Sequence, residues 1–324
     1  MDESVNYSPV VIPTLNRYEH LKQCLESLEE CAGSEYTDVY IGLDFPPTDK
    51  YVDGWKKVDA YLHEKEQKNR FHKLVVCRRD TNLGVTAADS NITRLYATVS
   101  QISDTYIYLE DDNVVSPNFL EYINKGLEKY KDDESVFAVV GYAHPYHFKH
   151  ADNNHYRHNT DMSAWGYGTW FKRYNRIGDY SRNGGFRRDF SIRNIFKFRH
   201  HGWLRLFDFI HYAYHKGYVL QSDGLMSAYL ILHDNYVITP TLSKVRNIGW
   251  DRSGNSFKLG MKGLEKIAER HNSQMIDDAE HFDYVGNDTT YMDYNNHIAA
   301  IESDGYMSFG QFVTKLWVSF FPVR

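Results

Sequence analysis

The first half of the chain alternates strand-like apolar runs with segments of helical periodicity. The strand-like runs are SPVVIPT (8–14), DVYIGLDF (38–45), KLVVCRRD (73–80), TYIYLEDD (105–112) and VFAVVGYA (136–143). Helices are predicted between them, the first after the LNR of residues 15–17 and the others around 52–66, 85–101 and 116–131. This βαβαβαβ order predicts an α/β fold with a mostly parallel sheet covered by helices, whose ligands bind beyond the carboxyl ends of the strands.

Polar residues gather where these runs end. The first run leads into PTLNR (13–17), the second ends at Asp44, the third leads into RRDTNLGV (78–85), and the fourth ends in three consecutive acids at 110–112. Neighbouring carboxylates repel one another, so a fold tolerates them where water screens them or where a cation neutralises them. No G-x-G-x-x-G follows the first run and no G-x-x-x-x-G-K-[ST] occurs in the sequence. Dinucleotide and P-loop sites therefore lose their main support.

Composition excludes several classes of protein. The 324 residues carry a formal net charge of −6, which gives no global reason to expect nucleic acid. The first residues lack the basic and apolar regions of a signal peptide, and no stretch approaches the ~18 apolar residues of a membrane span. Cys24, Cys31 and Cys77 have neither disulfide-framework nor zinc-site spacing. We expect a cytoplasmic protein, with the inner face of the cell membrane as a further place of action.

Three motifs resemble the nucleotide-sugar-binding half of GT-A-fold glycosyltransferases. They are PVVIPTLNRYEHLKQCLESL (9–28), NLGV (82–85) and YLEDDNVVSPNFLEY (108–122), and the last is similar to the E-D-D motif of the N-acetylglucosaminyltransferase I type. Family-2-like bacterial glycosyltransferases share the pattern. The resemblance implies a donor-binding half at 1–145 and a helix-rich acceptor-binding and catalytic half of the same GT-A domain at 146–306. A C-terminal amphipathic helix is expected at 307–324.

The same resemblance assigns roles in donor binding. Asp112 would ligate a divalent cation, Mn²⁺ or Mg²⁺, that neutralises the departing diphosphate, while Glu110 and Asp111 would orient the ribose, the donor sugar or metal-bound water. The rest of the expected donor site comprises Pro13, Thr14, Asn16, Arg17, Asp44, Asn82, Gly84, Arg246 and Asn247. A solvated acidic turn is the alternative interpretation of the triplet.

The second half offers candidates for the acceptor side. MSAWGYGTWFKRYN (162–175) is similar to a glycine- and aromatic-bearing acceptor loop, which points to Trp165, Gly166 and Trp170. Aromatic faces stack on sugars, but core packing of the two tryptophans explains the pattern nearly as well. QSDGLMSAYLILHDN (221–235) resembles the segment that carries the catalytic base, which points to Asp223. A helix N-cap is the alternative role for this residue. Other acids that remain open as the base are Asp161, Asp208 and Asp234.

Two further segments fall outside the core resemblance. Residues 172–205 contain ten Lys or Arg and two Asp, interleaved with aromatic residues, which suits anionic lipid, a lipid-linked acceptor, nucleic acid or a solvated helical face. The C-terminal stripe has apolar residues at helical spacing and is either core or a peripheral membrane helix. Its members are Phe309, Phe312, Val313, Leu316, Trp317, Phe320 and Phe321.

The sequence therefore predicts an inverting, metal-dependent glycosyltransferase with a nucleotide-sugar donor, UDP-linked by expectation. The acceptor would be a saccharide or a lipid-linked saccharide, in the synthesis of a surface polysaccharide or glycolipid. Two alternatives are a metal-dependent nucleotidyltransferase or phosphohydrolase and a non-catalytic carbohydrate-binding module. The first would need a glycine-rich basic loop or an aspartate nucleophile after the first strand, and PTLNR has neither.

Overall fold

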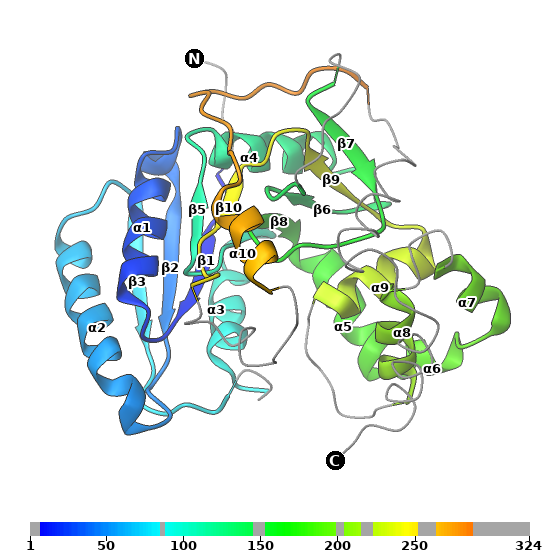
Figure 1. The fold of residues 1–324 in the computed structure, drawn as a ribbon, viewed down its shortest axis with the longest axis horizontal. Helices are drawn as coiled ribbons and strands as arrows, with labels where there is room; N and C mark the ends of the chain where they lie inside the picture. Colours follow the sequence, from blue (N-terminus) through cyan, green and yellow to red (C-terminus); the bar gives the residue numbers. More distant parts are fainter. Residues whose placement is uncertain are drawn as a thin grey trace.

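The computed structural model describes residues 7–84, 88–144, 153–198, 204–214, 223–251 and 264–287. Within them the central element is an eight-stranded sheet of order β3-β2-β1-β4-β8-β6-β9-β7 (Figure 1). The C-terminal stripe lies outside the described residues. The predicted fold class, a mostly parallel α/β sheet flanked by helices, is confirmed.

The first four strands are the first four predicted runs. They are β1 (Val10–Thr14), β2 (Asp38–Leu43), β3 (Lys73–Arg78) and β4 (Thr105–Tyr108), and all run parallel. In the middle strand β1, Val10, Val11 and Ile12 are fully buried because helices cover both faces of the sheet. The carboxyl ends of these four strands therefore share one edge, as the alternation predicts.

The sheet continues with β6 (Val136–Val140), which is the fifth predicted run, and with three strands from the second half of the chain. The three later strands are β7 (His155–His158), β8 (Tyr167–Trp170) and β9 (Tyr236–Pro240). Strand β8 lies between β4 and β6 and runs antiparallel to both, and β7 is antiparallel to β9. Both halves of the chain thus build one continuous sheet.

Helices of the first half cover the two faces of the sheet. They are α1 (Tyr18–Glu29), α2 (Val52–Gln67), α3 (Asn91–Val99) and α4 (Phe119–Lys129), with short 3₁₀ turns at Ser34–Tyr36 and Asp49–Tyr51. Tyr106 packs its ring on Tyr96 of α3, whereas a Cβ on Gly168, the partner of Ile107, would meet Ile123 of α4. Neighbouring residues of a strand point to opposite faces, so α3 and α4 lie on opposite sides.

One helix start differs from its predicted position. Helix α4 was expected at Ser116 but begins at Phe119, because Ser116 still donates its N–H to the Lys244 carbonyl at the end of strand β5 (Asn113–Val115). Helix α1 begins directly after Arg17 without a side-chain cap from the preceding residues. The side chain of Arg17 is instead used in the site described below.

Five helices gather at one end of the molecule (Figure 1). They are α5 (Phe171–Arg182), α6 (Gly185–Arg188), α7 (Ile192–Lys197), α8 (Leu204–Tyr214) and α9 (Asp223–His233). Near the middle of the sheet, β10 (Val245–Asn247) pairs antiparallel with β5, and α10 (Leu264–Asn272) lies beside it. Neither β5 nor β10 was predicted.

The basic segment at 172–205 is largely paired. Lys172 and Arg176 contact Glu134, Arg182 contacts Asp179, and Lys197 contacts Asp234. Arg173 is buried over the ring of Trp170 and donates to the carbonyls of Tyr130 and Lys131 at the end of α4. These contacts support the structural interpretation for most of the segment.

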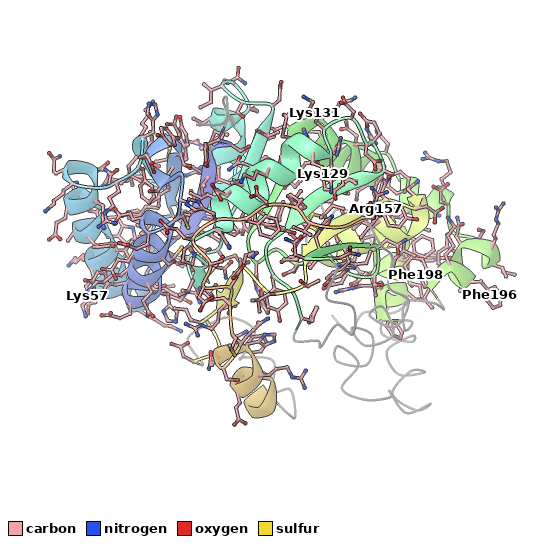
Figure 2. All side chains as sticks on the ribbon, turned by 90° about the horizontal axis from the view of Figure 1, so that it is seen from above. Lys57, Lys129, Lys131, Arg157, Phe196 and Phe198 are labelled. Carbon is pink, nitrogen blue, oxygen red and sulfur yellow. The ribbon has the colours of Figure 1, made fainter. Side chains whose placement is uncertain are left out.

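One part of this helical end remains open to solvent. Ile192 is 74% exposed and Phe196 56% exposed, and Figure 2 shows Phe196 at the outer end of the molecule with Phe198 nearby. Phe198 itself is buried against Phe209. Arg187 and Arg193 are also exposed and have no acidic partner among the described residues. We call Ile192, Phe196, Arg187 and Arg193 together the helical tip. Within the described part of the chain, no helix is both long enough and apolar enough to cross a bilayer.

Candidate functional site

The acid triplet occupies a tight turn between β4 and β5 at the carboxyl edge of the sheet. The N–H of Asn113 closes the turn on the Glu110 carbonyl at 3.1 Å. Asp111 and Asp112 are only 5% and 7% exposed, so this is not the solvated acidic turn of the alternative interpretation. Buried carboxylates require compensation by a cation or by hydrogen bonds.

Arg17 supplies that compensation for both aspartates. Its guanidinium contacts one carboxylate oxygen of Asp111 and lies 2.7 Å from Oδ2 of Asp112. The Thr14 hydroxyl donates to the other oxygen of Asp111 at 2.8 Å. Burial raises the pKa of Asp111, and Arg17 opposes that shift. Two residues of the PTLNR segment thus meet the acid triplet, as the carboxyl-edge argument predicts.

The other side of Asp112 is closed by β10 and the residues after it. The Asn247 amide donates to Oδ1 of Asp112 at 2.7 Å, and the N–H of Ile248 donates to the Asp112 carbonyl at 2.8 Å. A Cβ on Gly249 would overlap the Asp112 carboxylate, so the backbone approaches here as closely as glycine permits. Arg246 alternates with Asn247 along β10, so its side chain lies on the opposite face, where its Nε is buried without a hydrogen-bond partner in the described structure.

Glu110 differs from the two aspartates. Its carboxylate forms no hydrogen bond with the described residues, and burial together with the charges of Asp112, Asp223 and Asp111 raises its pKa well above the ordinary value. The structure thus brings Asp223, which is 113 positions later by number, into electrostatic range of the acid triplet. Among the described residues, Arg17 is the one cation in contact with the triplet, and it contacts Asp111 and Asp112 but not Glu110.

Asp223 begins helix α9 and is half-buried. Burial and the charge of Asp161 raise its pKa to about 7, against the opposing effects of Arg205 and the Ala164 backbone. A carboxylate with this pKa can accept a proton near neutral pH.

The other three candidate bases lie in different surroundings. Burial would raise the pKa of Asp161, but Arg205 and His144 outweigh it and hold that pKa below the ordinary range. Asp208 contacts Arg205 and lies against Gly224. Asp234 is exposed, pairs with Lys197 and follows the far end of α9. Of the four acids, Asp223 has the most suitable combination of position and pKa.

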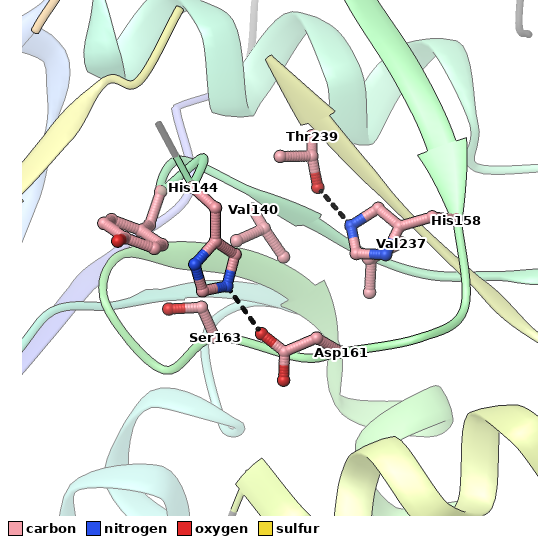
Figure 3. Close-up of a pocket in the computed structure, with 8 residues that line it drawn as sticks. Val140, His144, His158, Asp161, Ser163, Val237 and Thr239 are labelled. Carbon is pink, nitrogen blue, oxygen red and sulfur yellow. Dashed lines mark hydrogen bonds and ion pairs between the residues drawn. The ribbon is translucent and has the colours of Figure 1, made fainter. Parts of the chain in front are cut away.

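A small cavity adjoins Asp161 (Figure 3). His144 donates to Asp161 at 3.2 Å on one side, and the Nε2 of His158 lies 2.9 Å from the Thr239 hydroxyl on the other. Buried polar groups that are paired in this way fix side-chain positions. The cluster therefore holds Asp161 in place beside Asp223.

Expected nucleotide contacts lie at the ends of β2 and β3. Burial raises the pKa of Asp44. Asn82 donates to the Phe45 carbonyl at 2.8 Å and accepts from the N–H of Gly84, whose φ is +77°. These two residues therefore shape the loop beside Asp44. Pro13 pairs with Gly42 within the sheet, and the backbone of Asn16 packs on Gly54 of α2.

Sequence reasoning missed Arg79, which follows β3. It is only 7% exposed, and its Nε and Nη1 have no hydrogen-bond partner in the described structure. It lies 3.7 Å from Asp89 and exerts a charge effect on Asp44. A buried guanidinium with free donors can bind an anionic or carbonyl group. Its place in RRDTNLGV, directly after a strand, was the available signal.

The aromatic residues divide between two places. Trp165 packs edge-on against Tyr142 and Trp250, and Trp250 stacks on His271 at 4.7 Å. Gly166 has φ +72° and a Cβ there would meet Val245, so packing explains this glycine. Trp170 pairs with Thr105 at the opposite end of β8, under Arg173, and the structure does not bring it to this edge. Trp250 and His271 were not predicted.

The donor set suits one kind of cation binding. Within the described residues, no group of three or more His, Cys, Asp or Glu is placed to surround a metal ion. Mg²⁺ and similar ions are commonly held by one or two carboxylates together with substrate phosphates and water. The buried acids, with one arginine against three carboxylates, fit that mode with Asp112 as the protein ligand.

The model of the family described as glycosyl transferase family 2 matches residues 10–201. No curated protein matches the chain.

Three solved structures are distantly similar. The mannosyltransferase PcManGT from Pyrobaculum calidifontis, in complex with GDP-Man and Mn²⁺, is 15% identical over 53% of this chain and 46% of that chain, with a TM-score of 0.36. S. aureus TarS 1-349 is 12% identical over 73% and 59%, with a TM-score of 0.38. Apo-form GlyE of Streptococcus pneumoniae TIGR4 is 11% identical over 54% and 38%, with a TM-score of 0.31. The chain thus spans about half the length of the first of these proteins. These likenesses add nothing to the family match.

Proposed function

This chain belongs to glycosyl transferase family 2, and from that premise we propose that it transfers a sugar from a nucleotide-sugar donor to an acceptor hydroxyl with inversion. The predicted enzyme class, a GT-A-type glycosyltransferase, is confirmed at the level of the family. One observation carries the proposal: buried acids end β4 at the carboxyl edge, within electrostatic range of a second-half carboxylate, Asp223.

The donor would bind along the edge from β3 to β4. Arg79 and Asp44 would meet the nucleotide base, because both follow strands at this edge and Arg79 has buried donors without a partner among the described residues. Asp112 would hold a divalent cation, Mn²⁺ or Mg²⁺, which when bound offsets the charge that develops on the leaving diphosphate. Thr14 and Asn247 hold the two aspartates in position. A UDP-linked donor is the specific form that we propose.

Asp223 would act as the base. Inversion requires the acceptor hydroxyl to attack the anomeric carbon from the face opposite the leaving diphosphate, so its proton must pass to a group away from Asp112. Asp223 comes from α9, in a different half of the chain, and has a pKa of about 7. Asp161, tied to Arg205 and His144, is a much weaker proton acceptor.

The acceptor would bind at the two tryptophans near Gly249, Trp165 and Trp250. Trp165 and Trp250 are half-buried and in contact, and Trp250 directly follows Gly249, whose backbone packs on the Asp112 carboxylate. Aromatic faces pack on the C–H faces of sugars. This supports a saccharide acceptor.

We further propose that this acceptor is lipid-linked and that the enzyme works at the cytoplasmic face of a membrane in polysaccharide or glycolipid synthesis. The exposed Ile192 and Phe196 with the neighbouring Arg187 and Arg193 are the features that support it. Apolar side chains flanked by cations suit an anionic bilayer surface. The nucleotidyltransferase and carbohydrate-module alternatives have no comparable support.

The proposed function is tested by a thermal-shift panel of UDP- and GDP-sugars, each with and without Mn²⁺. A ligand that binds only the native state raises its unfolding temperature. We expect a rise for one donor class that depends on Mn²⁺ in the natural protein and is lost in Asp112→Asn. Stabilisation by no nucleotide sugar, with or without the metal, would contradict the proposal.

A further inference from the structure

The position of Arg17 raises a question about cation binding. Its guanidinium contacts both Asp111 and Asp112, and so occupies the place where a positive charge is most needed. The contact is largely shielded from water, since the two carboxylates are buried and the side chain of Arg17 is 23% exposed. A divalent cation that binds Asp112 must therefore compete with the positive charge of the Arg17 guanidinium.

The surroundings of Asp112 leave few positions for a second cation. Oδ1 already accepts from Asn247 and from Asn113, at 2.7 and 3.2 Å. Oδ2 faces Arg17 at 2.7 Å, with Gly249 packed against the same carboxylate. A divalent cation that binds Asp112 through Oδ2 would thus compete with the Nη1 group of Arg17 for that oxygen.

We infer that Arg17 is an exchangeable counter-cation: it neutralises Asp111 and Asp112 until a divalent cation binds Asp112, and it then pairs with the diphosphate of the donor. The guanidinium fork suits either partner, because carboxylate and phosphate both accept two parallel N–H donors. The exchange keeps each buried anion paired. It would also favour binding of metal and nucleotide together over metal alone. This inference rests on the proposed metal-dependent donor binding.

The test measures Mn²⁺ binding at pH 8 from the electron paramagnetic resonance signal of free Mn²⁺, with and without UDP. Arg17→Met removes the competing charge and keeps an unbranched side chain. Without UDP we expect it to bind Mn²⁺ roughly 10-fold more tightly than the natural protein, because a neighbouring unit charge opposes the cation. UDP should then strengthen Mn²⁺ binding less in the variant than in the natural protein, since the coupling between two ligands is reciprocal.

Arg70→Met is the matched control. It removes the same charge from an exposed arginine that pairs with Glu30 before the amino end of β3, at the opposite edge of the sheet from the acid triplet, so we expect Mn²⁺ affinity within about 2-fold of the natural value. If Arg17→Met fails to fold, Arg17→Lys replaces it. Lysine cannot span both carboxylates, and a gain of roughly 3-fold is expected.

The outcomes separate the two proposals. Mn²⁺–UDP binding by the natural protein without tighter Mn²⁺ binding in the Arg17 variant would overturn the exchange and leave the proposed function standing. Tighter Mn²⁺ binding in the variant, without nucleotide binding by either protein, would support the competition and overturn the proposed function.

Discussion

Asp223 combines two properties that a general base needs, a position within range of the acid triplet and a pKa near neutrality. If it accepts the acceptor proton, kcat/KM should rise with pH up to about 7 and then level off, because only the ionised carboxylate is a base. Asp223→Asn should lower kcat by about 100-fold or more, abolish this pH dependence and leave donor binding intact. A pH–rate profile of both proteins checks this, and a near-normal rate in the variant would return the residue to a structural role.

The same pKa has a consequence for stability. A carboxyl group whose folded pKa is raised contributes stability that is fully present below its unfolded pKa of about 4 and is lost as the pH rises through about 7. Asp223→Asn should therefore show a smaller loss of stability between pH 5 and 8 than the natural protein. Urea unfolding at both values measures that difference, and an equal loss in the two proteins would contradict the raised pKa.

Gly249 is a second residue that shapes the site, because the absence of a side chain leaves room for the Asp112 carboxylate. A methyl group there would overlap the Asp112 carboxylate, which Asn247 and Arg17 hold in place. We expect Gly249→Ala to weaken Mn²⁺-dependent nucleotide binding by about 10-fold, since a displacement of 1 Å at a catalytic group has large effects. Calorimetric titration measures it. Leu242→Ala, at an exposed position before β10, should bind normally, and equal binding by the two variants would show that the carboxylate adapts.

At the scale of elements, the helices α5 to α7 differ in role: α5 packs against the rest of the fold, whereas α7 exposes apolar side chains to solvent. Arg173 of α5 satisfies carbonyls at the end of α4, where a helix leaves its last acceptors unpaired. Further along, α7 exposes Ile192 and Phe196 instead of burying them. The composition of residues 172–205 does not distinguish the part that packs on the fold from the part that is exposed.

The helical tip permits a direct test of membrane contact. Ile192→Ser with Phe196→Ser should reduce co-sedimentation with vesicles rich in anionic lipid, because both apolar contacts are lost. Neutralising Arg187 and Arg193 should have a similar effect that is largest at low salt. Lys172→Gln, whose charge is paired with Glu134, is the control and should sediment normally. Equal sedimentation of all variants would place membrane contact elsewhere or exclude it.

At the scale of the whole molecule, the two predicted halves are joined through the sheet. Strand β8 is the bridge between β4 and β6, and Tyr106 of β4 packs on Phe171 and Tyr174 from the second half. Residues 1–145 alone would expose this edge and these rings to water. We therefore expect that piece to be aggregated or to lack a cooperative thermal transition by circular dichroism, with the full chain as the control. A folded, monomeric piece would make the first half an independent domain.

Local patterns in the sequence determined the first half of the fold and the place of the acid triplet. Alternation of apolar runs and helical periodicity depends on neighbouring residues, so it predicted β1 to β4, α1, α2 and the shared carboxyl edge. Thr14, Arg17 and the acids could be brought together in this way, because parallel strands end on the same side. The interval from β4 to the start of α4 was less legible, since β5 exists only through pairing with a distant strand.

The tertiary structure decided what contacts between distant residues control. Insertion of β8 between β4 and β6, closure of β10 over Asp112, and the separation of Trp170 from Trp165 all follow from strand pairing across many residues. No local signal reveals that Arg17 neutralises two aspartates, that Gly249 must lack a side chain, or that Asp161 shifts the pKa of Asp223. Burial and charge act through space, so these properties became visible only once the chain was folded.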